Sequence, residues 1–265
     1  MTDQMVHDGK YAGEVSEIAD VLRVEFADEA RDRLQSIDLQ MTEIRRGEGE
    51  LADLIKTVRE MALRFRGSAS NFGLWQLGLI AHRLEDFLAN VKKPPLAIID
   101  DIQKFIDAMV DVVDGRTDQD ADATLLVRGL PAKVRLDAGA IEVRDVEVLL
   151  VMLHGTGTHF VEREMQACGY RVSTCTSAFE ALPMIVRTQP DMVIISAVMP
   201  ELSGIDLAAA LIAMPATRNV PCALITSLDP NDDYLAFLPD RVPVIHKGPS
   251  FADDLAEALS SLFLI

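Results

Sequence analysis

The sequence predicts two domains of different fold class: an N-terminal four-helix bundle and a C-terminal doubly wound α/β domain. Three observations support this prediction. Apolar residues recur every three or four positions over residues 18–114, the stretch 114–122 is polar and acidic, and short apolar runs alternate with helix-length segments from Val146 onward. A chain of 265 residues is long enough for two such domains.

The first half contains four amphipathic segments, preceded by an N-terminal segment over residues 1–17. Arg45 and Gly47 follow the first of them, a cationic last turn and a glycine that are typical of a helix end. Short connections between the four segments predict an antiparallel helical bundle over residues 18–114. The defining apolar positions are Phe26, Ala30, Leu34, Ile37, Met41 and Ile44, then Leu54, Val58, Met61 and Phe65, then Leu77, Ile80, Ala81, Leu84 and Leu88, with 98–113 as the fourth segment.

Residues 115–145 are predicted to be a linker. Their first part is polar and acidic, as linkers often are. The stretch from Leu125 to Asp145 also contains apolar residues before Gly129 and Pro131. It either packs against one domain or joins the two.

Residues 146–265 alternate between apolar runs of strand length and amphipathic stretches. Five strands alternating with five helices predict a parallel sheet with helices on both faces, and its functional groups are expected at the carboxyl ends of the strands. The predicted strands are 146–152, 170–174, 192–196, 221–226 and 242–246, and the predicted helices are 157–167, 178–188, 203–213, 231–238 and 251–263.

The composition narrows the function classes. Lys and Arg number 25 against 42 Asp and Glu, a formal net charge of −17, which is unsuited to binding the phosphates of nucleic acid. No apolar run approaches the ~18 residues that a membrane span needs. The N-terminus, with Asp3, His7 and Asp8, does not resemble a signal peptide. We therefore expect a cytoplasmic protein with no nucleic-acid or membrane partner.

No metal or cofactor site is predicted. The three cysteines show no metal-ligand spacing and lie in or beside apolar segments, so we expect buried free thiols at Cys168, Cys175 and Cys222. Three histidines could approach one another near the first and fifth strand ends and ligate zinc. No spacing motif supports such a site at His154, His159 and His246.

A motif after the second amphipathic segment resembles a known family. The stretch Arg66-Gly67-Ser68-Ala69-Ser70-Asn71-Phe72-Gly73-Leu74, followed by Ala81-His82-Arg83-Leu84-Glu85, resembles the histidine-phosphotransfer (HPt) family over residues 18–114. Members are four-helix bundles with a histidine ahead of a Lys-Gly or Arg-Gly pair. The resemblance places the phosphorylated histidine four residues before Gly67, where this chain has Leu63. An alkyl side chain has no nucleophile, which implies a bundle without phosphotransfer at this position.

Periodicity places Leu63 away from the apolar stripe of its helix and therefore in solvent. One interpretation is a harmless substitution, because single exposed leucines are common. The interpretation that we favour is a docking surface kept without its chemistry, since apolar centres ringed by polar groups are typical of binding patches. The candidate docking surface consists of Arg59, Leu63, Arg66, Gly67 and Ser70.

The C-terminal half resembles the receiver domain of response regulators. Pro190-Asp191-Met192-Val193-Ile194-Ile195, leading to Val198-Met199-Pro200-Glu201-Leu202-Ser203-Gly204, is similar to the family's third strand and following loop. In receivers an acidic pair after the first strand and an aspartate after the third hold Mg²⁺, and that aspartate accepts the phosphoryl group. A Thr or Ser and a Lys hold the phosphoryl oxygens.

The resemblance assigns these roles to positions that have mostly changed. The acidic pair falls on Met152 and Leu153, which are expected to fill its space, and the phospho-acceptor falls on Ser196, whereas Thr226 and Lys247 are retained. Without the carboxylates, Mg²⁺ has nothing to replace its waters. In-line phosphoryl transfer then lacks both its nucleophile and its charge neutralisation.

These inferences predict a non-enzymatic, bacterial two-component adaptor without a cofactor. Its partner is expected to be a histidine kinase, a receiver domain or another two-component regulator, and a homodimer stays open. One alternative is phosphotransfer through His82 or Ser196, although His82 is expected to be a solvated histidine and Ser196 a buried serine bonded to Lys247 or to the backbone. Another is sensing of a small ligand in the altered receiver pocket.

Overall fold

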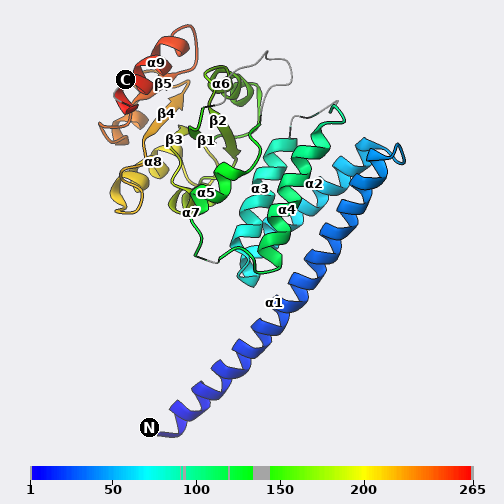
Figure 1. The fold of residues 1–265 in the computed structure, drawn as a ribbon. Helices are drawn as coiled ribbons and strands as arrows, with labels where there is room; N and C mark the ends of the chain where they lie inside the picture. Colours follow the sequence, from blue (N-terminus) through cyan, green and yellow to red (C-terminus); the bar gives the residue numbers. More distant parts are fainter. Residues whose placement is uncertain (1, 90, 92–93, 119, 134–143, 264–265) are drawn as a thin grey trace. The chain divides into compact units, whose positions relative to one another are not determined.

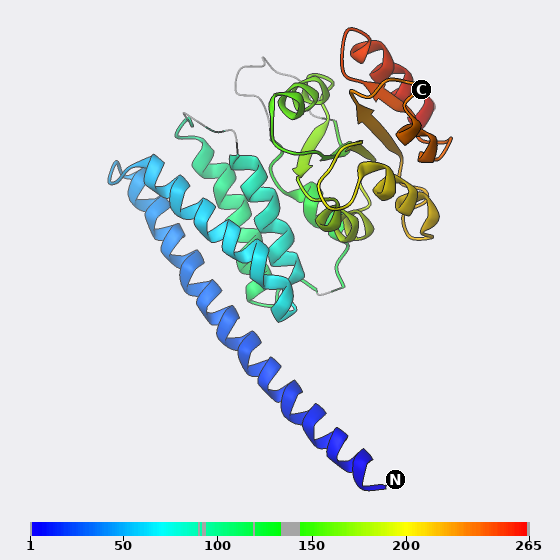
Figure 2. The same cartoon turned by 180° about the vertical axis from the view of Figure 1, so that it is seen from behind.

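The computed structural model describes residues 2–89, 91, 94–118, 120–133 and 144–263. The chain forms two compact units, Met1–Ala121 and Asp122–Ile265 (Figure 1 and Figure 2). They correspond to the helical and the α/β domains that the sequence predicts.

The described part of the first unit contains four α-helices and one short 3₁₀ helix. They are α1 (Thr2–Arg45), α2 (Leu51–Ser68), η1 (Ala69–Phe72), α3 (Trp75–Leu88) and α4 (Ile98–Val113). α1 and α3 each contact both α2 and α4, so the helices close around one core and the predicted bundle is confirmed. The segment 1–17, set apart by the sequence, is helical from Thr2, because no proline interrupts the backbone ladder before the bundle begins.

The core of the bundle is built from the periodic apolar positions. All fifteen positions named for the first three helices are buried, from Phe26 to Leu88. At one end of the core the Phe26 ring stacks on Phe72, with centroids 4.5 Å apart, and meets Phe65 edge-on at 6.1 Å. Such aromatic pairs add about 0.5–1.5 kcal/mol to the burial of the rings.

A tight turn connects α2 to α3. Gly73 has a φ of 73°, a left-handed conformation that is strained for other residues, and its N–H donates to the carbonyl of Ser70 at 3.2 Å. Leu74 donates to the carbonyl of Ala69 at 2.9 Å. The turn therefore fixes the path of α3 beside the end of α2, where the motif Ser70-Asn71-Phe72-Gly73 lies.

The second unit contains a five-stranded parallel sheet among the described residues. The strands are β1 (Glu147–Val151), β2 (Arg171–Cys175), β3 (Met192–Ser196), β4 (Cys222–Thr226) and β5 (Val244–His246). Their order is β2-β1-β3-β4-β5, which is the doubly wound arrangement expected from the alternating pattern. β1 and β3 are adjacent, with Val151 opposite Ile195, so the chain segments after these two strands leave the sheet side by side.

Helices cover both faces of this sheet. α6 (Thr156–Ala167) and α9 (Phe251–Phe263) share one apolar cluster with the strands, and α7 (Ala178–Thr188) and α8 (Gly204–Ala213) share the other. The helix predicted at 231–238 is instead the 3₁₀ helix η2 (Asp233–Phe237). Asp229 and Asp232 accept hydrogen bonds from backbone N–H groups two residues on, which favours turns over a helix.

The predicted linker 115–145 is only partly a linker. Residues Ala123–Gly129 form α5, a short helix that contacts α7 and belongs to the second unit. The helix begins where Asp122 caps it, accepting a hydrogen bond from the N–H of Thr124 at 2.8 Å. Part of the linker, 134–143, lies outside the described residues.

The prediction of three buried thiols is wrong at one position. Cys175 and Cys222 are buried strand residues, whereas Cys168 is exposed after the end of α6, where the chain turns toward β2. In the described part of the chain, none of the helices is both long enough and apolar enough to cross a membrane.

Candidate functional site

The first candidate site is the α2 face of the bundle around Leu63. The Leu63 side chain is 54% exposed, although the residues that flank it on the core side, Met61 and Phe65, are buried. The predicted exposure of Leu63 is therefore confirmed. Gly67 lies one turn further along, and a Cβ added there would meet nothing within 4 Å. The helix surface next to Leu63 is therefore not covered by other parts of the bundle at Gly67.

The two arginines of this surface are held in place by α3 and its end. The Arg59 guanidinium donates to the backbone carbonyls of Leu88 and, at 3.3 Å, of Val91. Arg66 forms an ion pair with Glu85 on α3 at 3.2 Å. These contacts brace the two cations on either side of Leu63 along α2. The surface is thus a leucine between two positioned cationic groups, with Ser70 exposed beyond them.

His82 does not lie where the sequence places it. Its side chain is 6% exposed, so the expectation of a solvated histidine is wrong. α3 is buried on more than one side, because it contacts both α2 and α4. A prediction based on one apolar stripe therefore gives too few buried residues on α3, and His82 is one of those it leaves out. A buried imidazole is poorly placed to exchange a phosphoryl group with another protein.

The second candidate site is the carboxyl edge of the sheet, where Ser196 ends β3. Ser196 is 8% exposed, and its hydroxyl donates to the backbone carbonyl of Val198 at 3.3 Å. The expected buried serine bonded to a backbone group is confirmed. Behind it, α8 begins so close that a Cβ on Gly204 would lie 1.9 Å from the Ser196 carbonyl oxygen. Ser196 is therefore part of a tightly packed strand end.

Met152 and Leu153, assigned to the acidic pair, separate in the structure. Met152 is buried and packs into the apolar cluster under α6 and α9, as expected. Leu153 instead exposes 51% of its side chain, so the expectation that it fills the old acid site is wrong. Val198, which follows the adjacent strand β3, is 66% exposed. The exposure of Val198 was not predicted, because the residue lies in a loop that has no periodic pattern.

The two retained positions are Thr226 and Lys247. Thr226 is 2% exposed, and its hydroxyl oxygen accepts a hydrogen bond from the N–H of Leu228 at 3.0 Å. The backbone N–H of Lys247 donates to the Thr226 carbonyl at 2.7 Å, which joins the ends of β4 and β5. The Lys247 ammonium is exposed and lies near Gly157 at the start of α6. Thr226 and Lys247 thus lie at the carboxyl edge of the sheet. Ser196 lies at the same edge, at the end of β3, the strand between β1 and β4.

The three histidines considered for zinc have separate surroundings. His159 lies 3.5 Å from the carboxylate of Glu162, and the Nδ1 atom of His246 lies 3.2 Å from Asp254. His154 is exposed after β1. Among the residues that the structure describes, no group of three or more His, Cys, Asp or Glu side chains is arranged to hold a metal ion.

The helical unit matches a family of known proteins. The Hpt domain family matches residues 21–115, which run from the bundle part of α1 through the end of α4. This match covers the surface around Leu63 and the turn at Gly73. It agrees with the resemblance carried by the Arg66-Gly67 motif.

The α/β unit has relatives among response regulators. The chain is 32% identical over 100 residues to the response regulator PleD of Caulobacter vibrioides, which covers 38% of this chain and 20% of PleD. It is 33% identical over 78 residues to the transcriptional regulatory protein PrrA of Mycobacterium leprae, covering 29% of this chain and 33% of PrrA. The chain therefore spans a fifth to a third of these relatives' length.

Solved receiver structures are also similar. The receiver domain of the sensor histidine kinase PA1611 from Pseudomonas aeruginosa is 20% identical and covers 44% of this chain and 98% of that domain, with a TM-score of 0.40. A receiver domain of a histidine kinase from Syntrophus aciditrophicus is 26% identical and covers 45% of this chain and 92% of that domain, with a TM-score of 0.40.

The chain thus consists of two domains, a helical bundle ahead of a doubly wound α/β domain, and each domain is similar to proteins of two-component signalling. Residues 21–115 match the Hpt domain family, and the C-terminal domain is similar in sequence to response regulators. Below, the second unit is called the receiver-like domain.

Proposed function

We propose that this protein is a non-catalytic adaptor of two-component signalling, which acts by binding other signalling proteins. The observation that carries the proposal is the exposed leucine at position 63. The family resemblance gives this position to the phospho-acceptor histidine. A leucine there has no nucleophile, yet it stands at the centre of a surface braced by Arg59 and Arg66.

The receiver-like domain supports the same conclusion from its own chemistry. At the carboxyl edge of its sheet, the positions assigned to metal-binding carboxylates hold Met152, Leu153 and Ser196. None of these side chains carries the charged oxygen that Mg²⁺ requires. Retention of Thr226 and Lys247 does not compensate, because these positions supply neither a carboxylate nucleophile nor the carboxylates that would hold a charge-neutralising metal.

The proposed partner is a histidine kinase, a receiver domain or another two-component regulator. Leu63 would enter an apolar part of the partner's docking face, and the arginines beside it would set the orientation through charged groups. An adaptor bound in this way blocks phosphotransfer as a decoy or brings two regulators together. His82 and Ser196 are weak substitutes as acceptors, since both are more than nine-tenths buried.

One experiment tests both parts of the proposal. Purified receiver domains and histidine-kinase catalytic regions from the source organism are assayed for binding to the wild-type protein, and the mixtures are phosphorylated with ATP or acetyl phosphate. We expect at least one partner to bind, and no phosphate on this chain by intact mass. Leu63→Arg is expected to weaken that binding at least tenfold, about 1.4 kcal/mol.

Leu39→Arg is the matched control, because Leu39 is a similarly exposed leucine of the same bundle, on α1 (64% exposed). It should leave the dissociation constant unchanged. Equal affinity of wild type and Leu63→Arg would show that the partner does not bind at this surface. Phosphate on the chain overturns the non-catalytic part, and mapping it to His82 or Ser196 identifies the acceptor.

A further inference from the structure

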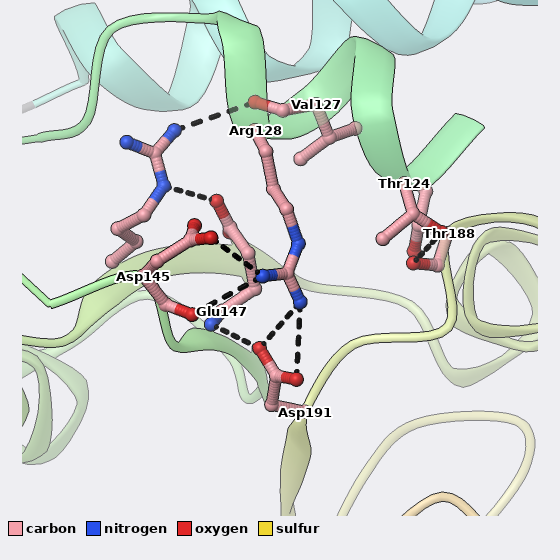
Figure 3. Close-up of polar contacts among 8 residues, drawn as sticks. Thr124, Val127, Arg128, Asp145, Glu147, Thr188 and Asp191 are labelled. Carbon is pink, nitrogen blue, oxygen red and sulfur yellow. Dashed lines mark hydrogen bonds and ion pairs between the residues drawn. The ribbon is translucent and has the colours of Figure 1, made fainter. Parts of the chain in front are cut away.

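The amino edge of the receiver-like sheet, opposite the carboxyl edge, carries a network of charged side chains that the function proposed above does not use. Figure 3 shows Arg128 of α5 reaching this edge. Its guanidinium donates to both carboxylate oxygens of Asp191 at 2.9 and 3.0 Å. It also forms an ion pair with Asp145 at 3.0 Å. One guanidinium nitrogen thus bridges both oxygens of Asp191 while the other faces Asp145, and such charge-assisted hydrogen bonds are stronger than neutral ones.

The strands hold the acceptor of this contact in place. Asp191 lies just before β3, and its carboxylate also accepts the backbone N–H of Glu147, the first residue of β1, at 2.8 Å (Figure 3). Asp191 therefore joins the start of two neighbouring strands to α5. Arg128 is only 24% exposed at its side chain, so solvent screens this pair less than a surface ion pair.

A second arginine holds the carboxyl end of α5. Arg171 of β2 pairs with the buried carboxylate of Glu147 and donates to the carbonyl of Leu130 at 2.7 Å and of Val127 at 3.4 Å. These carbonyls belong to the last turn of α5 and the residue after it, where intrahelical partners run out. A cation at a helix carboxyl end is favourable for the same reason.

The other end of α5 is also attached. Asp122 caps the helix through Thr124, and this hydrogen bond lowers the pKa of the Asp122 carboxyl. The Thr124 hydroxyl donates to the carbonyl of Thr188, at the end of α7, at 3.0 Å. Ala123 and Val127 are buried. A seven-residue helix is too short to persist alone in water, so these contacts hold it in place.

On the side of the Hpt domain, the chain is held until Asp118. Gln76 of α3 donates to the Asp118 carbonyl at 2.7 Å. Arg116 forms ion pairs with Asp111 at 2.6 Å and with Asp114 at 2.8 Å, just after α4. The stretch that the sequence predicts as a linker of thirty-one residues, 115–145, is therefore tied at both ends.

We propose that α5 is a clamp that shortens the covalent tether between the two domains to residues 119–121. With the clamp closed, Asp118 and Asp122 are at most about 14 Å apart along the chain. With the clamp open, the tether would run from Asp118 to the start of β1, and an unconstrained chain of that length has a mean end-to-end distance of about 30 Å. The clamp thus sets how far one domain can move from the other, which controls the effective concentration of each for a shared partner.

The test is hydrogen exchange of the full-length protein, with Arg128→Ala as the variant. We expect backbone amides of residues 123–130 to exchange at least tenfold faster than in wild type, while those of β1 and β3 stay protected. Arg163→Ala is the matched control, because Arg163 is an arginine of the same domain that pairs at 3.2 Å with its neighbour Glu164. It should leave α5 protection unchanged.

A second variant keeps the proposal testable if Arg128→Ala fails to fold. Asp191→Asn retains an acceptor for the Glu147 N–H but loses the ion pair, and should loosen α5 by a smaller factor. Small-angle scattering should show a larger maximum dimension for Arg128→Ala than for Arg163→Ala. Unprotected α5 amides in wild type, or equal exchange in wild type and both clamp variants, would overturn the proposal. An unchanged maximum dimension with a loosened α5 would refute control of the tether.

Discussion

The two positions that the family resemblances assign to phospho-acceptors have opposite surroundings. Leu63 on α2 is 54% exposed, whereas Ser196 at the end of β3 is 8% exposed. The glycines beside them differ in the same way. A Cβ on Gly67, one turn from Leu63, would meet nothing within 4 Å, but a Cβ on Gly204 would lie 1.9 Å from the Ser196 carbonyl oxygen.

This difference shows that a change at a surface position and a change at a strand end have different structural consequences. A helix residue that faces solvent can be replaced with little effect on its neighbours, so the bundle keeps an accessible surface around Leu63. A strand end beneath the first turn of α8 is enclosed, so replacement there must fit the packing. The surface around Leu63 is therefore accessible, whereas Ser196 is enclosed by the packing of the domain.

The largest expected effect comes from Gly204→Ala. The added methyl group would overlap the Ser196 carbonyl and the Ile195 side chain, so β3 and α8 must separate. Overpacking of this severity costs about 3 kcal/mol or more. Urea unfolding followed by circular dichroism should show a destabilised receiver-like domain.

Gly67→Ala is the matched control in the bundle. It places a methyl group in open space within a helix and should stabilise the helical unit by about 0.5–1 kcal/mol. Trp75, the only tryptophan, lies in the bundle and reports its unfolding by fluorescence. Similar stabilities for Gly204→Ala and wild type would mean that the end of β3 is not enclosed. The two assigned positions would then not differ in their surroundings.

A second, intermediate effect concerns restored chemistry. Leu63→His places an imidazole on an exposed face, where a phosphorylated receiver domain can reach it, so we expect detectable phosphorylation. Ser196→Asp restores only one carboxylate, because Met152 and Leu153 still supply no metal ligands. We therefore expect no uptake of phosphate from acetyl phosphate with Mg²⁺. Intact mass distinguishes the two variants from wild type.

Phosphorylation of Ser196→Asp but not of Leu63→His would contradict the contrast between the two positions. Uptake by Ser196→Asp would show that the carboxyl edge still binds Mg²⁺ through groups not identified above. A Leu63→His protein that stays unmodified with every phosphorylated receiver tested would show that the α2 face no longer docks such domains.

The smallest expected effect is a difference in thiol reactivity within the receiver-like domain. Burial raises the pKa of the Cys222 thiol to about 11, so its reactive thiolate is scarce at pH 8 in the folded state. Because this folded pKa is raised, the stability it contributes is present at neutral pH and is lost as pH rises toward 11. Iodoacetamide at pH 8 should modify the exposed Cys168 and leave Cys175 and Cys222 intact until urea unfolds the domain. Equal rates at Cys168 and Cys222 in the folded protein would contradict a closed sheet interior.

Much of the fold could be predicted from periodicity alone. The helix stripe from Phe26 to Ile44 is buried as predicted, and the strand 192–196 and helix 178–188 have the predicted bounds. Local pattern suffices for these elements because each buries one regular set of side chains. The exposure of Leu63 follows from the same geometry, since it needs only the angle of the residue around its helix.

Other features depend on neighbours that are distant in sequence. His82 is buried because α3 contacts two helices, and Leu153 is exposed although the adjacent Met152 enters the core. The helix α5 depends on Arg171 and Asp191, which lie more than forty residues further along the chain. No local period predicts contacts of this kind.

The sequence by itself determined two domains, their fold classes and the residue types at the assigned phosphate positions, because periodicity, turns and motifs are local properties of the chain. Tertiary structure alone decided that His82 is buried, that Leu153 faces solvent and where the linker ends. Exposure depends on how many elements pack around a residue. The clamp at α5 exists only because three strands bring Arg171, Glu147 and Asp191 to one edge of the sheet.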